Sequence, residues 1–184
     1  KERLFISWDW KTTLNLAYSV DEIEWQIKEK AAFASDYVYP NYVKIFADGG
    51  PFSATSYLLE PYEASFVGED GNLGGTNLSE DEFVEAFKMF DEWGVGVHVH
   101  AMGDGTIRRV ISALEEMNRQ NGNSGVHHKI AHNTMLQVED ISRIAKLNSV
   151  NVDFSPPIWY PHAGATPGLI AAIGEDRYQN IYPV

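Results

Sequence analysis

The stretch GVGVHVHAMGD, residues 94–104, contains the pattern that decides the fold. Its valines alternate with other residues, so the valines share one face of an extended strand, and Gly96, His98 and His100 share the opposite face. Asp104 then opens a stretch in which apolar residues recur at helical spacing. A strand that leads through a short turn into a helix is the repeating unit of parallel α/β sheets.

Similar units lie on both sides of this stretch. Ser19-Val-Asp-Glu22 and Ser79-Glu-Asp-Glu82 are capping boxes that predict helix starts, and another helix is predicted at about 138–147. The alternation of strands and helices predicts an α/β fold, either a doubly wound sheet or part of a (β/α)8 barrel. Apolar runs predict five strands, at residues 4–8, 42–48, 94–100, 128–132 and 150–154. Residues 51–78 lack clear periodicity, and a loop of this length indicates a functional role.

Composition narrows the class of protein. The chain has 184 residues, 44% of them hydrophobic and 22% charged, which is typical of a globular domain with a buried core. Its formal net charge of −12 argues against nucleic acid and anionic membrane as partners. With no cysteine, any metal must be bound by histidine, carboxylate or a modified lysine. The chain begins at Lys1 without a signal-like apolar stretch, so its sequence does not indicate a localisation.

Lys44 is the unexpected residue of its strand. Alternation places it on one face with Tyr42, Phe46 and Asp48, where a bare ammonium inside a sheet would be costly. It could reach solvent at a sheet edge or pair with Asp48. Alternatively, its neutral amine could react with carbon dioxide to form a carbamate, which would bind metal as a carboxylate does.

Two histidines stand at strand ends on consecutive strands. His100 and His132 each precede a turn, and the carboxyl ends of parallel strands are where α/β folds bind ligands. We expect their rings to converge, with His128 on the same face as His132. Two imidazoles and an anionic oxygen suit zinc or a similar divalent cation, although each histidine alone is also compatible with a structural role.

Three further residues are candidates for substrate binding. Trp159 and His162 lie in the loop after the last predicted strand, and His98 lies on the same strand face as His100. Asp104 opens a helix, where capping of backbone N–H groups is the expected role of a carboxylate.

Four motifs occur in one order along the chain: VKIFADG (43–49), HAMGD (100–104), KIAHN (129–133) and SPP (155–157). Together they resemble the amidohydrolase superfamily, in the branch of metal-dependent hydrolases related to N-substituted formamide deformylase and the YtcJ-like proteins. The resemblance extends from about Ser19 to the end of the chain.

The resemblance implies a (β/α)8 barrel with one or two divalent metal ions, zinc being preferred, at the carboxyl ends of its strands. It implies that Lys44 is the carboxylated ligand of strand four, and that His100 and His132 are the ligands of strands five and six. It also implies hydrolysis of an amide-type carbon–nitrogen bond in a small-molecule substrate by a metal-activated hydroxide.

Two elements of the family pattern are not found in this sequence. No histidine precedes His98, so the first-strand H-x-H pair is missing, and the acidic residue expected after strand eight has no counterpart. We therefore expect a central fragment, with strands three to seven, that lacks strand eight and the flanking β-domain. Such a fragment should be inactive by itself, and its open barrel edges could lead to homodimers or aggregates.

Two alternatives to the hydrolase remain open at this stage. One is a non-catalytic barrel paralogue with a ligand-binding or regulatory role, similar to proteins named as exoenzyme regulators. The other is a self-contained doubly wound domain of unrelated function.

Overall fold

The computed structural model describes residues 4–10, 20–147, 149–155 and 166–181. Its strands are β1 (Leu4–Trp10), β2 (Val38–Phe46), β3 (Gly96–Ala101), β4 (His128–His132) and β5 (Val150–Asp153). Its helices are α1 (Val20–Lys28), η1 (Lys30–Ala32), η2 (Pro51–Ser53), α2 (Ala64–Val67), α3 (Glu80–Glu92), α4 (Asp104–Asn121), α5 (Val138–Ile144), α7 (Thr166–Ile173) and α8 (Glu175–Tyr178).

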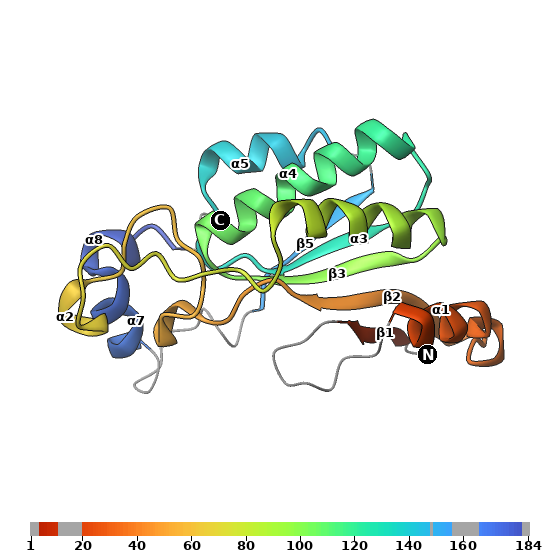
Figure 1. Cartoon of the computed structure of the whole chain (residues 1–184), viewed down its shortest axis with the longest axis horizontal. Helices are drawn as coiled ribbons and strands as arrows, with labels where there is room; N and C mark the ends of the chain where they lie inside the picture. Colours follow the sequence, from red (N-terminus) through yellow and green to blue (C-terminus); the bar gives the residue numbers. More distant parts are fainter. Residues whose placement is uncertain (1–3, 11–19, 148, 156–165, 182–184) are drawn as a thin grey trace.

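The five strands form one parallel sheet in the order β1-β2-β3-β4-β5. Helices α3, α4 and α5 lie together on one face of it (Figure 1). A doubly wound sheet would reverse its strand order at a switch point and carry helices on both faces. Sequential order with helices on one face is the arrangement of consecutive βα units in a barrel. The predicted α/β fold is therefore confirmed in the form of a partial barrel.

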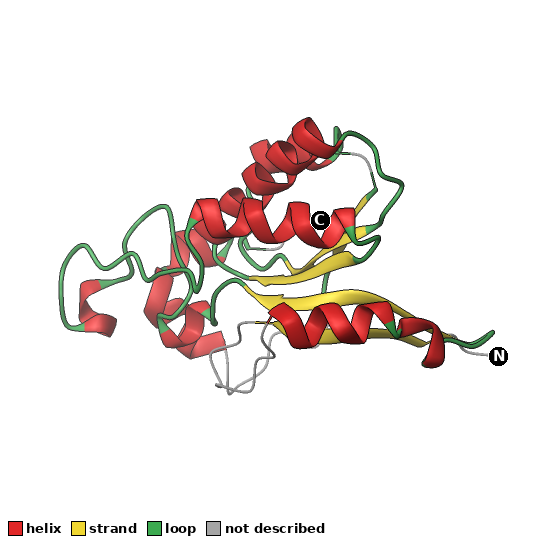
Figure 2. Cartoon of the chain, turned by 45° about the vertical axis from the view of Figure 1, so that its right-hand side comes forward, coloured by secondary structure: helices red, strands yellow, loops and turns green. Residues whose placement is uncertain are grey.

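The main core lies between the sheet and the helix layer (Figure 2). As alternation predicts, Val43 and Ile45 of β2 and the valines of β3 are fully buried there. The facing side chains come from α3 and α4 and include Phe83, Phe87, Phe90, Ile107, Ile111 and Leu114. Burial of each such side chain contributes roughly 1.5–3 kcal/mol relative to exposure.

The predicted helix ends are confirmed in part. Ser79 accepts a hydrogen bond from the backbone N–H of Glu82, and Glu82 accepts one from the backbone N–H of Ser79, so this capping box is confirmed. Ser19 lies outside the described residues. Helix α5 ends at Ile144, which is earlier than predicted. Across the described ranges, no helix has the length and apolarity needed to span a membrane.

The loop at residues 51–78 folds against the C-terminal helices. Leu58 and Tyr62 of this loop share a second, smaller core with Leu169 and Ile173 of α7 and with Met135. Figure 1 shows the loop and its helix α2 beside α7 and α8, beyond the end of the sheet. The loop therefore extends the molecule at the carboxyl ends of the strands.

His128 begins β4 and points into the helix layer. Its Nδ1 accepts a hydrogen bond from the backbone N–H of Val97 at 3.2 Å, which places the proton on Nε2. Nε2 donates to Asp91 Oδ1 of α3 at 3.1 Å. Asp91 also accepts hydrogen bonds from Asn121 and Ser124. This buried network joins the end of α3, the end of α4 and the start of β4.

Replacement of Asp91 by alanine should lower the free energy of unfolding by about 2–3 kcal/mol. The buried ring of His128 would lose its acceptor, and an unpaired buried polar group costs roughly 1–3 kcal/mol. Urea unfolding of the two proteins at pH 7 measures the difference. The exposed neighbour Glu92 provides the control, since Glu92→Ala should change stability by no more than about 0.5 kcal/mol. Equal stability of Asp91→Ala and Glu92→Ala would contradict the structural role of the network.

Candidate metal centre

Strands β2 and β3 present polar side chains on the face opposite the main core. Lys44 is paired in register with His98, and Phe46 with His100. Gly96 lies deeper on this face, and the ring of Tyr42 occupies the space beside it: an added Cβ at Gly96 would lie 2.9 Å from that ring and 1.9 Å from the carbonyl oxygen of His127. The glycine thus makes room for the backbone of His127 and for the ring of Tyr42.

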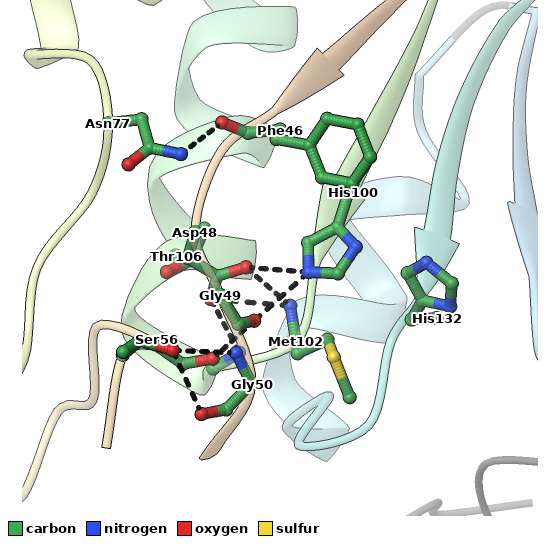
Figure 3. A network of polar contacts seen from close by, with 12 residues as sticks. Phe46, Asp48, Gly49, Gly50, Ser56, Asn77, His100, Met102, Thr106 and His132 are labelled. Atoms are coloured by element: carbon green, nitrogen blue, oxygen red, sulfur yellow. Dashed lines mark hydrogen bonds and ion pairs between the residues drawn. The ribbon is translucent and has the colours of Figure 1, made fainter. Parts of the chain in front are cut away.

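His132 reaches the same face from the end of β4. Its ring centroid lies 4.5 Å from that of His100, with the planes inclined at 66°. Figure 3 shows the two side chains approaching each other from neighbouring strands. The predicted convergence of these imidazoles is therefore seen in the structure.

The predicted common face of His128 and His132 is wrong. His128 follows strand alternation and contacts Asp91 in the helix layer, on the side where Ile130 is also buried. His132 leaves this alternation because its φ is +76°. A left-handed residue redirects the chain, so spacing along a strand no longer tells which face a side chain takes.

In His100 and in His132, a hydrogen bond occupies one ring nitrogen and leaves the other available to bind a metal ion. His100 Nε2 lies 3.0 Å from the carbonyl oxygen of Gly49, which can only accept, so the proton is on Nε2 and the lone pair on Nδ1. His132 Nδ1 lies 2.9 Å from the hydroxyl of Ser155, so Nε2 is the nitrogen of His132 that is left to bind a metal ion. Each ring therefore keeps one nitrogen that could bind a metal ion.

Burial keeps these histidines neutral. Desolvation, followed by the charges of Lys44 and Lys129, lowers the pKa of His98 to about 3. Desolvation, then His100 and Lys44, lowers the pKa of His132 to about 4. The pKa of His100 is also lowered, by burial first and by Lys44. Neutral imidazole is the form that binds metal. Lys44 lies on the same face, with its Nζ 5.0 Å from the centroid of the Phe46 ring, which is 5.1 Å from the ring of His100.

Asp48 has a role that the sequence did not indicate. Its buried carboxylate accepts hydrogen bonds from the backbone N–H groups of Met102, at 3.1 Å, and Gly103, at 2.9 Å. Its Oδ1 lies 3.5 Å from His100 Nε2 (Figure 3). Burial raises the pKa of Asp48 to about 7, although these donors lower it in part. Asp48 thus links the chain after β2 to the turn after β3 and borders His100.

Among the residues that the structure describes, the two histidines need a further donor to bind a metal ion, and Lys44 is the candidate. Within the described ranges, no three residues among His, Asp and Glu are grouped so that they could bind a cation. His100 and His132 supply two neutral nitrogens, and a lysine carbamate would add the oxygen ligand that a divalent ion prefers. Trp159 and His162 lie outside the described residues. His98 lies beside Lys44, below His100 on β3.

A family profile and a curated relative both match this chain over most of its length. Residues 5–184 match the sequence profile of the amidohydrolase family. YtcJ of Bacillus subtilis (strain 168), an amidohydrolase by assignment, is 30% identical over 159 residues, which make up 86% of this chain and 27% of YtcJ.

Two solved structures share the fold. An uncharacterized metal-dependent hydrolase from Pyrococcus furiosus has a TM-score of 0.66 at 22% identity, over 85% of this chain and 31% of that protein. A second, from Pyrococcus horikoshii OT3, has a TM-score of 0.63 at 19% identity, over 90% of this chain and 32% of that protein. The chain therefore spans about a third or less of the length of these relatives.

The metal-free chain should lose stability as the pH falls from 7 to 5, and His98 should account for part of the loss. Below the ordinary histidine pKa of 6.5 the unfolded chain binds protons that folded His98, with a pKa of about 3, does not bind. Asp48 acts in the opposite direction, because its raised pKa makes the folded chain bind a proton first.

A comparison of variants isolates the contribution of His98. His98→Gln should reduce the loss of unfolding free energy between pH 7 and 5 by roughly 1 kcal/mol, an amount that allows for the partial exposure of the ring. Urea unfolding with a chelator present at both pH values measures it. The exposed His127 supplies the control variant His127→Gln. The same pH dependence in both variants would show that His98 is not held neutral.

Proposed function

This chain belongs to the amidohydrolase family, and from that premise we propose that the protein containing it is a metal-dependent hydrolase of amide-type carbon–nitrogen bonds. In this proposal Lys44, His100 and His132 bind one or two divalent cations, with zinc the preferred ion. The observation that carries the proposal is the 4.5 Å approach of two neutral imidazoles beside Lys44, at the carboxyl ends of adjacent strands.

The hydrogen bonds assign a ligand atom to each histidine. His100 would bind through Nδ1, because Gly49 accepts the proton of Nε2. His132 would bind through Nε2, because Nδ1 contacts Ser155. In each case the second nitrogen is held by the protein, which fixes the orientation of the ring.

Lys44 would take part as a carbamate. Its neutral amine forms a bond from Nζ to the carbon of carbon dioxide and releases one proton, which leaves an anionic group with two oxygen donors. Lys129 lies on the same face, where its charge acts on His98, and it would favour the anion. A bound divalent ion supplies Lewis acidity toward a carbonyl oxygen and makes water easier to deprotonate.

The remaining roles concern the substrate. We assign binding of a small amide-type molecule to His98 and to the loop that carries Trp159 and His162. His98 is neutral at pH 7, so it can donate or accept a hydrogen bond without adding charge. We expect activity to require the longer protein, because the chain spans only 27% of YtcJ and about 31% of the Pyrococcus furiosus hydrolase.

Replacement of Lys44 by alanine in the full-length protein should remove bound metal and lower the rate of amide hydrolysis by at least about 100-fold, the cost typical of a lost electrostatic catalyst. His100→Ala and His132→Ala should have the same effects. Elemental analysis of the purified proteins and turnover of a panel of N-formyl and N-acyl amines measure both. The exposed Lys146 gives the matched control, and Lys146→Ala should keep metal and activity. Stoichiometric metal and full activity in Lys44→Ala would refute the ligand assignment.

A further inference from the structure

Two successive residues at the end of β4 have left-handed backbone conformations. The φ of His132 is +76° and that of Asn133 is +48°. Residues other than glycine adopt this region at an energetic cost, and asparagine is one of the few that adopt it readily. A pair of such residues persists only where the surrounding structure holds it in place.

Asn133 supplies contacts that hold this conformation. It is fully buried, and its backbone N–H donates to the carbonyl of Ala101 in β3 at 3.1 Å. Its side-chain Nδ2 donates to the carbonyl of Ile130 in β4 at 2.8 Å and to that of Asp153 in β5 at 3.3 Å. One residue thus ties together the carboxyl ends of three adjacent strands.

The orientation of the Asn133 amide is fixed by these acceptors. A rotation that exchanged Oδ1 and Nδ2 would place an oxygen against two carbonyl oxygens. Oδ1 itself is buried and has no hydrogen-bond partner among the described residues. An unpaired buried acceptor opposes folding, so only the Nδ2 end of this side chain forms stabilising hydrogen bonds. What the contacts do provide is a defined backbone geometry next to His132.

That geometry decides where His132 points. Regular alternation would place His132 on the side of Ile130, which is buried against the helix layer. The left-handed turn instead brings its ring to 4.5 Å from the ring of His100.

We propose that Asn133 is a positioning residue for His132. Asn133 holds the left-handed turn, and this turn brings the imidazole of His132 to the metal centre. The proposal rests on the proposed function for its link to metal, whereas the effect on the position of His132 is independent of any metal. Asn133 acts through His132 and does not itself touch the ion or the substrate.

Variants of Asn133 in the full-length protein test the proposal. Asn133→Ala loses the side-chain hydrogen bonds and disfavours positive φ, so affinity for Co²⁺ or Zn²⁺ should fall by about 10–100-fold, as for other residues that orient metal ligands. Asn133→Gly also loses the hydrogen bonds but permits positive φ, so its affinity should lie between those of the wild type and Asn133→Ala. Competitive titration with a chromophoric chelator measures affinity, and the Co²⁺ absorption spectrum reports ligand geometry.

A second measurement needs no metal. With histidine labelled selectively, NMR of the metal-free protein should show nuclear Overhauser contacts between the His100 and His132 rings. These contacts should weaken in Asn133→Gly and disappear in Asn133→Ala. Asp91→Ala is the control for general loss of stability, because it should destabilise the protein at the opposite ends of the strands while it keeps the ring contacts and the metal affinity.

The outcomes separate the two proposals. Unchanged ring contacts in Asn133→Ala would overturn the role of Asn133, and if that variant does not fold, unchanged contacts in Asn133→Gly would do so. Equal losses in Asn133→Gly and Asp91→Ala would also overturn it. If the wild type binds no metal but the ring contacts depend on Asn133 as expected, the positioning role stands and the proposed metal centre is wrong.

Discussion

The arrangement of the strands at the carboxyl end of the sheet depends on the hydrogen bonds that the side chain of Asp48 accepts. A buried carboxylate is stable only when donors surround it, and here the backbone N–H groups of Met102 and Gly103 lie within 3.1 Å. This fixes the chain after β2 against the turn after β3. The adjacent carbonyl of Gly49 then accepts from His100, so separation of these strand ends would break the hydrogen bonds of Asp48 and release a ring nitrogen of His100.

Each central strand separates two environments. On one side, aliphatic residues of β2 and β3 pack against phenylalanines of α3, and the close packing of this layer holds the backbone in position. On the other side, the same backbone presents Lys44, His98 and His100, which are costly to bury. The packed apolar face therefore makes the strands rigid, and rigid strands fix the spacing of the rings on the polar face. Sites built on strands hold such spacing more precisely than sites built on loops.

Much of the fold could be predicted from the sequence, because apolar alternation and capping boxes reflect local physics. The five strands, the buried faces of β2 and β3 and the start of α3 follow from them. The convergence of His100 and His132 also follows, from their places at strand ends. The face of His128 was predicted wrongly, since a positive φ at His132 is not visible in a sequence without glycine there. Asp48 and Asn133 lie within two of the quoted motifs, but their contacts join residues far apart in the chain, so the motifs alone did not indicate them.

The second core has a consequence for motion at the carboxyl end of the sheet. Leu58 and Tyr62 pack with Leu169 and Ile173 in a cluster separate from the one beneath α3 and α4. Local opening of this cluster breaks contacts of the loop at 51–78 and of α7 at the same time, while the packing behind Lys44 and His100 is retained. In hydrogen exchange such a division defines two cooperative units. Segments whose packed residues are more than 100 positions apart in the sequence then exchange together as one unit, and the strands that carry Lys44 and His100 exchange as another.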